Sequence, residues 1–532
     1  MKLTNSLTSN FFLPFQPKRS LRFSWILLVI SAFCGSVPAA DDVQQTEIQS
    51  SRQVVKQAEK LARKGNFAEA ENVLRRFLIQ NATDVPVQLS LSSILLKQRK
   101  IVQSYKVSFE VAKNSKNSRA LALVGMALLN LGNFKDAALL LNNAGALNER
   151  EPLVWQGLGL IDFYENRIQE GVKKLENAVY LDENEPDFAF TLAQVYARAE
   201  KYKEAAQMYD RFLQVSPLSD TDRRDRIKGL IGFLRYLGGK QKLYDIAKDA
   251  PQTIIPIRLA RDRPIIEVGM SGSNEKFKFV LDTGSGISVI SEETAKKLKM
   301  KPISRGGMAR AVGGDGKFEI VYGFLRSINL GQVKINNVPV YIRKFHDSGE
   351  HVDGYIGLSL ISKFLTTVDY PNLTFTLTKK DQETATGLSA NLNKDSIALP
   401  LRLTSSGFLS GEVHLHGVET AQNFIVDTGA SISVISQGLA DSDQLSGFLT
   451  TEKMRVIGAA GVTENVRAFL LPKMSFGTHS RESIKAIALD LNVINEASGF
   501  EQAGILGGNF LKNYSLTFDF QNSKVTFIPV KK

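Results

Sequence analysis

The chain has 532 residues, of which 43% are hydrophobic and 23% are charged. These proportions are ordinary for globular protein and exclude wholesale disorder, and the length predicts about three or four domains of roughly 100–200 residues each. The net charge of +12 includes four basic and no acidic residues within residues 1–40, which leaves 12 − 4 = +8 for the rest. Because that excess is spread along the chain, we expect no nucleic-acid binding.

Residues 1–40 have the pattern of an export signal. Three basic residues precede an apolar run from Phe23 to Phe33, and the small-residue stretch GSVPAA follows. The run is shorter than the roughly 20 residues that a membrane span needs. We therefore predict a signal peptide cleaved near Ala39 or Ala40, with an uncleaved N-terminal membrane anchor as the alternative. Either reading predicts an exported protein, in a periplasm, a secretory lumen or the cell exterior.

The single cysteine of the chain, Cys34, lies within this signal. A processed chain would contain none, which excludes disulfides, thiolate metal sites and a cysteine nucleophile. His414 and His416 alternate on a predicted strand and would share one face. Since no third ligand is evident, we expect solvent-facing histidines there, with a zinc site as the alternative.

Residues 50–217 contain an internal repeat. The segments GNFAEA, RKIVQS, GNFKDA, NRIQEG and EKYKEA end at a small residue, at Ala70, Ser104, Ala137, Gly171 and Ala205, and these positions are 34, 33, 34 and 34 residues apart. Each small residue follows an aromatic or aliphatic one by about a helical turn, so we expect two helices to pack closely there. A period of this length is typical of stacked helical units.

The units resemble tetratricopeptide repeats. The matching residues are Trp155, Leu158, Gly159 and Ala178 in one unit, and Leu192, Ala193, Tyr196, Tyr209 and Pro217 in the next. The resemblance implies an all-α solenoid of about five units whose concave surface docks a protein or peptide, with a spacer as the alternative role. A basic amphipathic helix from Arg223 to Leu237 is predicted to cap the stack, and Lys242–Ala250 is read as helix and connector, so that residues 218–252 form the cap and connector.

From about Ile254 the pattern changes to short alternating apolar segments separated by Gly, Asn and Asp, which is typical of all-β domains. The segments form two matched series. FVLDTGSGISVI (Phe279–Ile290) belongs to the first, and FIVDTGASISVI (Phe424–Ile435) to the second. We therefore predict two lobes, at residues 253–380 and 397–532, joined by a linker at 381–396.

Both series resemble the aspartic peptidases of the retropepsin and pepsin clan, whose lobes each carry Asp-Thr-Gly and a later apolar-apolar-Gly element. Asp282-Thr283-Gly284 precedes Gly357 by 357 − 282 = 75 residues, and Asp427-Thr428-Gly429 precedes Gly507 by 507 − 427 = 80. The resemblance implies an aspartic endopeptidase that hydrolyses polypeptides through Asp282 and Asp427, with no metal and no cofactor. Since one chain carries both halves, we expect a monomeric catalytic unit. Two alternatives remain, an inactive peptide-binding scaffold and lobes that pair between chains.

The chemistry explains why two aspartates are needed. One group must take a proton from water while another polarises or protonates the substrate, and two carboxylates that share a proton can do both. Thr283 and Thr428 are expected to hydrogen-bond across the lobe interface. Gly284 and Gly429 are expected to let backbone amides approach the carboxylates, where a Cβ would interfere.

The two motifs differ at the next residue, Ser285 in the first and Ala430 in the second. Ser285 could hydrogen-bond the outer oxygen of Asp282, and Ala430 cannot do this for Asp427. We therefore expect Asp282 to be the ionised member of the pair.

One flap hairpin is predicted in each lobe, between its Asp-Thr-Gly and its later Gly. Their tips are VGGDG, with Gly313 and Gly314, and IGAAG, with Ala459 and Ala460. Small residues permit tight, mobile turns that could close over a substrate. The tyrosine of the pepsin flap is missing from both tips, and Tyr322 lies beyond the first.

Overall fold

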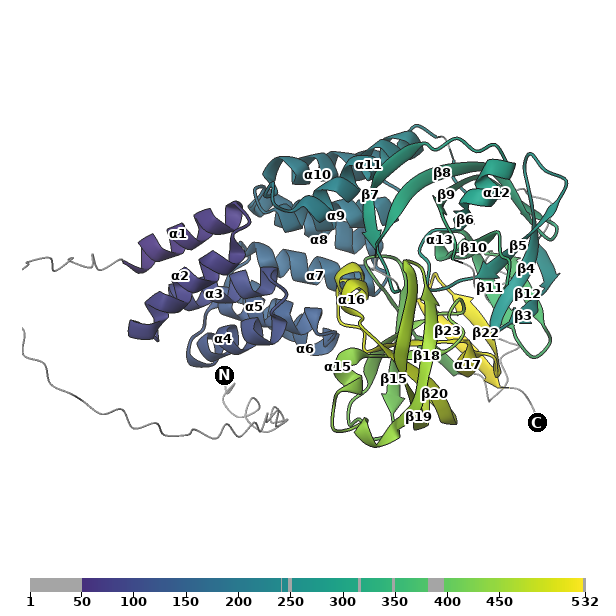
Figure 1. The fold of residues 1–532 in the computed structure, drawn as a ribbon. Coiled ribbons are helices and arrows are strands. Elements are labelled where there is room, and N and C mark those ends of the chain that lie inside the picture. The colour runs from purple at the N-terminus through teal and green to yellow at the C-terminus, as the bar shows by residue number, and fades with distance from the viewer. Residues whose placement is uncertain are drawn as a thin grey trace, which may run out of the picture. The chain divides into compact units, whose positions relative to one another are not determined.

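The computed structural model describes residues 50–240, 242–246, 251–313, 317–346, 350–380 and 397–529. The predicted signal or anchor, the linker at 381–396 and Gly314 lie outside these ranges. The described chain confirms the predicted fold class, because helices occupy its first part and β-strands dominate the second (Figure 1). No helix among the described residues combines the length and hydropathy needed to cross a membrane.

The helical region consists of five helix pairs followed by one longer helix. The paired helices are α1 (Ser51–Arg63), α2 (Phe67–Gln80), α3 (Val85–Lys97), α4 (Ile101–Asn114), α5 (Ser118–Asn130), α6 (Phe134–Leu147), α7 (Pro152–Tyr164), α8 (Ile168–Leu181), α9 (Pro186–Arg198) and α10 (Tyr202–Val215). The small residue of each repeat is buried in the second helix of its pair. Between α7 and α8 the backbones themselves come close, since a Cβ on Gly171 would lie 2.9 Å from the carbonyl oxygen of Gly159. The 34-residue period therefore corresponds to close helix packing.

Local signals at the helix ends account for these boundaries. Ser50 and Gln53 form a capping box at α1, in which the Ser50 amide donates to the Gln53 side chain at 2.8 Å. Helices α7 and α9 begin with Pro152 and Pro186, whose fixed φ suits the first helical position and whose missing amide costs nothing there.

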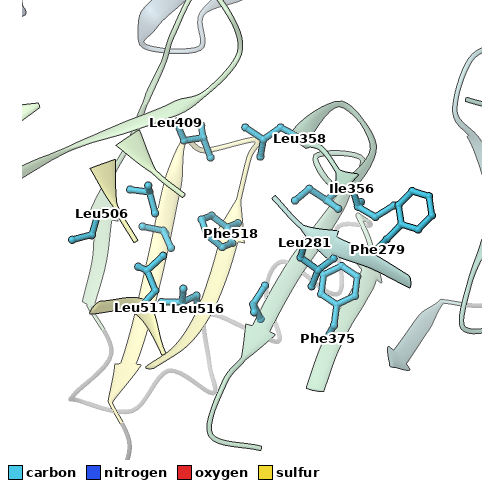
Figure 2. Packing of buried hydrophobic residues seen from close by; sticks show 14 of the residues in the cluster. Phe279, Leu281, Ile356, Leu358, Phe375, Leu409, Leu506, Leu511, Leu516 and Phe518 are labelled. Atoms are coloured by element: carbon cyan, nitrogen blue, oxygen red, sulfur yellow. The ribbon is translucent and has the colours of Figure 1, made fainter. Parts of the chain in front are cut away.

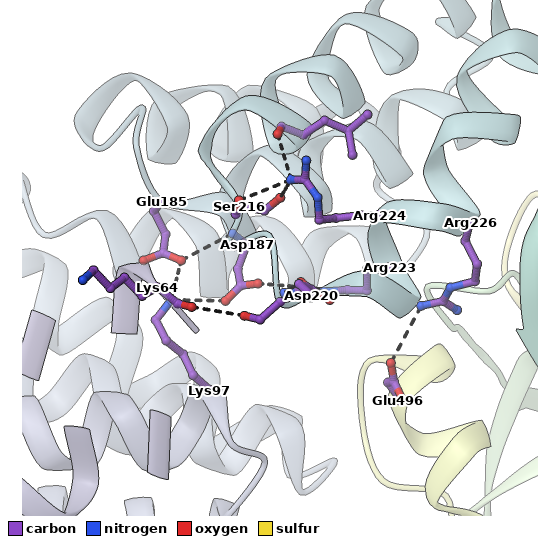
Figure 3. Close-up of polar contacts among 12 residues, drawn as sticks. Lys64, Lys97, Glu185, Asp187, Ser216, Asp220, Arg223, Arg224, Arg226 and Glu496 are labelled. Atoms are coloured by element: carbon purple, nitrogen blue, oxygen red, sulfur yellow. Dashed lines mark hydrogen bonds and ion pairs between the residues drawn. The ribbon is translucent and has the colours of Figure 1, made fainter. Parts of the chain in front are cut away.

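The longer helix, α11 (Thr221–Gly238), joins a network of charges that connects distant repeats (Figure 3). Lys97, at the end of α3, contacts Glu185 and lies 3.3 Å from Asp187 at the start of α9. Arg223 of α11 pairs with the same Asp187 at 2.8 Å. The hydroxyl of Ser219 also donates to the carbonyl of Lys64, at 3.1 Å. These contacts hold the first two repeats against the last repeat and the cap.

The segment read as helix and connector is instead partly a strand. Asp245–Ile246 form β1, which pairs antiparallel with β9 (Val333–Arg343) of the first lobe. The helical reading was wrong because an available sheet edge outweighs local helix preference over so short a stretch. Residues 247–250 lie outside the described part.

The first lobe contains β2 to β12. Besides β9, these strands are β2 (Gln252–Pro256), β3 (Arg258–Ala260), β4 (Arg263–Met270), β5 (Lys276–Leu281), β6 (Val289–Ser291), β7 (Ser304–Arg310), β8 (Lys317–Leu330), β10 (Gly354–Ile356), β11 (Phe364–Asp369) and β12 (Thr374–Lys379), with helices α12 (Glu292–Lys297) and α13 (Leu358–Ile361).

The second lobe repeats this order. Its strands are β13 (Ile397–Pro400), β14 (Arg402–Leu403), β15 (Leu409–Leu415), β16 (Gln422–Val426), β17 (Ser433–Ser436), β18 (Leu449–Gly458), β19 (Gly461–Phe476), β20 (His479–Leu489), β21 (Gly504–Leu506), β22 (Tyr514–Asp519) and β23 (Lys524–Pro529). Its helices are α15 (Gln437–Ala440), α16 (Asn492–Ser498) and α17 (Gly508–Leu511), and a single 3₁₀ turn covers Ser446–Phe448. The central strand orders, β5-β10-β6-β9 and β16-β21-β17-β20, are equivalent. The duplication seen in sequence is thus a duplication of topology.

A shared sheet joins the lobes, in the order β13-β23-β22-β11-β12-β2. Strand β11 of the first lobe pairs antiparallel with β22 of the second, with Val368 opposite Leu516. Buried apolar side chains of both lobes pack around this sheet, among them Leu281, Phe375 and Phe518 (Figure 2). Because one continuous core supports both lobes, the ends of β5 and β16 are held in a defined relation.

Candidate active site

Each predicted catalytic aspartate follows the end of a buried strand. Asp282 follows β5 and Asp427 follows β16, and each of these strands pairs in parallel with the strand that precedes the later Gly. The amide of Asp282 donates to the carbonyl of Ile356, and the amide of Asp427 to that of Leu506, both at 3.0 Å. The two loops therefore leave their sheets in the same way.

Thr283 and Thr428 cross the lobe interface, as expected from their position. The hydroxyl of Thr283 donates to Val426 O at 2.7 Å and accepts from the amide of Thr428 at 3.0 Å. The hydroxyl of Thr428 donates to Leu281 O at 2.7 Å and accepts from the amide of Thr283 at 3.2 Å. Both side chains are buried. These four hydrogen bonds tie the two loops together and bring the aspartates side by side.

The glycines of the two motifs allow this approach. The Gly284 amide donates to Asp282 Oδ1 at 2.9 Å, and the Gly429 amide to Asp427 Oδ1 at 2.7 Å. A Cβ on Gly284 would lie 2.4 Å from Cγ of Asp427, and a Cβ on Gly429 would lie 2.7 Å from Cγ of Asp282. Each glycine thus leaves room for the carboxyl group of the opposite lobe.

Gly357 and Gly507 lie behind the loops. A Cβ on Gly357 would come within 2.6 Å of the Ile287 backbone, and one on Gly507 within 2.7 Å of the Ile432 backbone. The short helices that follow them also donate amides to the loops, including Leu358 to Ser285 O at 2.8 Å. The later Gly elements therefore support the two Asp-Thr-Gly loops through close packing and amide hydrogen bonds.

The expectations for Ser285 and for the ionised aspartate are not met. The hydroxyl of Ser285 donates to Ile287 O at 2.8 Å, within its own loop, and not to Asp282. The tight turn after Gly284 brings that carbonyl within reach of the serine. Neither Ser285 nor Ala430 therefore distinguishes the two carboxyl groups through its side chain.

Hydrogen bonds distinguish them instead, since both carboxyl groups are buried. Burial, the neighbouring Asp427 carboxyl and the hydrogen bond between the two hold the pKa of Asp282 well above its usual range. Burial raises the pKa of Asp427 as well, but the Gly429 amide, the hydrogen bond with Asp282 and the amides of Ala430 and Gly284 oppose it. Because amide donors favour the charged form, the shared negative charge is better placed on Asp427 and the proton on Asp282.

This assignment predicts how Asp282→Asn changes stability with pH. A carboxyl whose pKa is higher in the folded state contributes stability that is full below its unfolded pKa of about 3.9 and is lost as pH rises through the folded pKa. Asparagine cannot ionise, so it does not incur that loss. We expect the variant to unfold at higher urea concentration than the native chain at pH 7, with the difference vanishing near pH 3.

Asp245→Asn is the control of opposite sign for this experiment. A hydrogen bond from Lys242 lowers the pKa of Asp245, so its contribution is present at neutral pH and is lost in acid. Asp245→Asn should therefore lower the urea midpoint at pH 7. A destabilised Asp282→Asn chain at pH 7 would contradict the protonated assignment.

Comparison with known proteins agrees with this geometry. An aspartyl protease family model matches residues 266–360 and 411–510, one segment in each lobe, and a tetratricopeptide repeat model matches residues 157–220. Tetratricopeptide repeats precede a duplicated aspartyl-protease domain in this chain. No curated protein matches it in sequence.

Among solved structures, the aspartic proteinase of Irpex lacteus is 13% identical over 53% of this chain and 98% of its own, with a TM-score of 0.36. A thermophilic TPR protein of Thermus thermophilus is 20% identical over 34% of this chain and 99% of its own, with a TM-score of 0.30. The pilF protein of Pseudomonas aeruginosa is 19% identical over 35% of this chain and 86% of its own, with a TM-score of 0.26.

The flaps of the aspartyl-protease domain are the hairpins β7–β8 and β18–β19, and their tips meet. The Ala460 amide donates to Val312 O at 3.1 Å, and a Cβ on Gly313 would lie 2.2 Å from the carbonyl oxygen of Gly461. Arg343 of β9 donates to Ala459 O at 2.7 Å. Gly313 has a φ of +100°, which favours glycine at this turn. Contacts between the tips thus hold the flaps together in this structure.

Beneath the flaps lies a cavity of about 1950 Å³. Asp282 and Asp427 both line it, together with Val312 and Ala459 of the two flap tips. Both carboxyl groups therefore face one cavity, and both come from one chain.

The repeat region forms part of the same cavity wall, which sequence reasoning missed. Helices α9, α10 and α11 contribute Arg198, Tyr209 and Phe233 to the lining. Phe233 stacks on Tyr322 of flap strand β8, with ring centroids 4.6 Å apart, and Ser304 of β7 donates to Gly229 O of α11 at 2.7 Å. Tyr322 is therefore buried against the cap and does not cover the aspartates.

A second contact joins the repeats to the other lobe. Phe500, which is fully buried, packs edge-on against Phe134 and Tyr164, with ring centroids 4.9 and 5.0 Å away. The Glu501 amide donates to Asn130 O at 2.8 Å. No periodic signal marks these contacts, because they join residues more than 300 positions apart.

His414 of β15 and His416, which lies in the turn just beyond that strand, are both exposed, as predicted for solvent-facing histidines. In the described ranges no three potential metal-ligating side chains lie together.

Proposed function

We propose that this protein is an exported aspartic endopeptidase that hydrolyses peptide bonds with a water activated by Asp282 and Asp427. The observation that carries the proposal is the pair of carboxyl groups held together by the crossed threonine bonds and open to one cavity. Two coupled carboxyl groups with separated pKa values are suited to simultaneous acid and base catalysis.

In the proposed mechanism Asp427 is the base and Asp282 the acid. The Asp427 carboxylate takes a proton from water, whose oxygen bonds to the substrate carbonyl carbon, while Asp282 donates its proton to the carbonyl oxygen. The resulting diol collapses as the C–N bond breaks: Asp427 gives its proton to the leaving nitrogen, and one diol hydroxyl returns a proton to Asp282 as the carbonyl of the acid forms. The two glycine amides keep each carboxyl in position throughout.

We propose that a peptide enters by separation of the flap tips, whose contacts join the two hairpins over the cavity. Strand β7 is held by α11, whereas β18 has mostly exposed or half-buried residues. We therefore infer that the second flap moves more readily than the first. The hydrogen bond from Arg343 to Ala459 O would then re-form over the bound peptide.

We further propose that the catalytic unit is monomeric and that the repeats take part in binding the polypeptide substrate or a partner protein. The first proposal is supported by the two aspartates of one chain, and the second by the repeat residues that line the cavity. Residues 1–40 would direct export or act as a membrane tether.

The test is cleavage of a mixture of unfolded proteins by the full processed chain at pH 3 to 8, with products identified by mass spectrometry. We expect internal cleavage over a bounded pH range, because activity requires one proton on the pair. No cleavage at any pH would favour the alternative of an inactive peptide-binding scaffold. The cavity between the aspartates is the observation that favours the enzyme over that scaffold.

A further inference from the structure

Arg198 lies where the end of helix α9, the second lobe and the loop of Asp282 meet. It is the last residue of α9, and its Nη2 donates to Ser406 O of the second lobe at 2.6 Å. The same Nη2 is 3.1 Å from where a Cβ on Gly286, in the loop of Asp282, would be. It also covers Gly407, where an added Cβ would lie 1.2 Å away. The guanidinium thus borders the catalytic loop and lines the catalytic cavity.

The charge of Arg198 has no carboxylate partner in the described chain. Its one hydrogen bond there is to Ser406 O, although a guanidinium has five N–H donors. The nearby acidic residue, Glu200, pairs with Lys363 instead. Another arginine of the cavity wall, Arg343, differs because its charge interacts with Asp282.

Tyr202, Tyr209 and Tyr341 line the same cavity as Arg198. Burial lowers the pKa of Arg198, but the guanidinium remains protonated at any physiological pH. A charge kept in a low-dielectric wall without a counter-ion is costly, and a planar carboxylate matches a guanidinium in two parallel hydrogen bonds.

We propose that Arg198 binds a carboxylate of the peptide substrate, so that the repeat region supplies a specificity site for acidic peptides within the catalytic cavity. This inference rests on the proposed peptide hydrolysis. The carboxylate could belong to an Asp or Glu side chain or to a peptide C-terminus, and both present the same group. Because Gly286 follows Asp282 closely, the bound carboxylate lies within a few residues of the scissile bond.

The experiment uses the full processed chain and a neutral dodecapeptide with an amidated C-terminus. Each position is replaced in turn by Glu or by Gln, and one further peptide has a free C-terminal carboxylate. We expect kcat/KM for the Glu peptide to exceed that for its Gln twin at one position by roughly 10- to 100-fold, as for a hydrogen bond to a charged group. If a free C-terminus is the ligand, kcat/KM for the peptide with the free C-terminal carboxylate exceeds that for its amidated counterpart by the same factor.

Arg198→Gln should reduce that ratio to about one, whatever its effect on cleavage of the neutral peptide, and Arg198→Lys should restore part of the ratio. Arg211→Gln is the matched control, because Arg211 also donates to a backbone carbonyl, Glu183 O at 3.2 Å, but does not line the cavity. A native chain that does not discriminate acid from amide at any position would overturn the proposal. So would an unchanged ratio in Arg198→Gln, since an arginine that only connects the domains would affect both peptides equally.

Calorimetric binding of the same peptides to the Asp282→Asn chain separates this inference from the proposed function. A preference for the acidic twin that disappears in Asp282→Asn/Arg198→Gln would support the carboxylate site even if the native chain cleaves nothing. Equal binding of acidic and neutral twins would contradict the site, whether or not the chain is a peptidase.

Discussion

Replacing Asp427 by Asn in the otherwise intact chain is expected to lower kcat/KM for peptide hydrolysis by about 10²- to 10⁴-fold, the usual contribution of a general base. The asparagine amide retains the size of the side chain and can still accept from the Gly429 amide, which donates to Asp427 Oδ1 at 2.7 Å. It cannot take a proton from water. We expect Asp282→Asn to be as damaging, because it removes the proton donor to the carbonyl oxygen.

The double variant should be little worse than either single one, since residues that act as a unit are not additive. Asp441→Asn is the control, because Asp441 pairs with Arg467 at 2.6 Å on the surface of the same lobe and does not line the cavity. Activity is measured on a cleaved reporter peptide, and circular dichroism verifies the fold. A folded Asp427→Asn chain with native activity would place the chemistry elsewhere.

Thr428→Val is expected to have the largest effect on stability. Valine has nearly the shape of threonine but removes the hydroxyl that donates to Leu281 O and accepts from the Thr283 amide. Both backbone groups would remain buried without these bonds, at about 1–3 kcal/mol each, so the free energy of unfolding should fall by about 2–6 kcal/mol. The aspartates would also lose their fixed separation, and activity should fall at every pH.

Thr367→Val is the matched control, since the hydroxyls of Thr367 and Thr517 lie 2.9 Å apart across the sheet that joins the lobes. That pair is only partly buried, so water can replace the bond and the expected loss is about 1 kcal/mol or less. Urea unfolding gives the midpoints, and hydrogen exchange of peptides covering 279–290 and 424–435 locates the change. Equal losses in the two variants would show that the crossed bonds contribute nothing beyond an ordinary inter-lobe contact.

The contact between repeats and protease lobes changes how the docking prediction is understood. The sequence predicted that the concave surface of the repeats docks a partner away from the aspartates. In the structure, the ion pair of Lys97 and Asp187 joins distant repeats to each other. Helices α9, α10 and α11 instead line the cavity that holds Asp282 and Asp427. In the proposed function, substrate binding and hydrolysis would therefore share residues, and deletion of the repeats would open one side of the cavity.

The sequence alone determined the features that depend on local periodicity and on residue type. The 34-residue spacing identified the helix pairs, because the two helices of each pair pack closely only if a small residue recurs at the same position of every repeat. The two Asp-Thr-Gly segments identified the two loops, because only glycine leaves space for the facing carboxyl group.

Only the tertiary structure decided which groups meet across long separations. The direction of the Ser285 hydroxyl, the placement of charge on Asp427 and the pairing of β1 with β9 depend on neighbours that no short pattern specifies. Arg198 is the clearest case, since a basic residue at a helix C-terminus is ordinary by itself. Arg198 matters for the proposal because the fold brings the end of α9 against the loop of Asp282. Contacts of this kind depend on the packing of whole domains, which a sequence period does not encode.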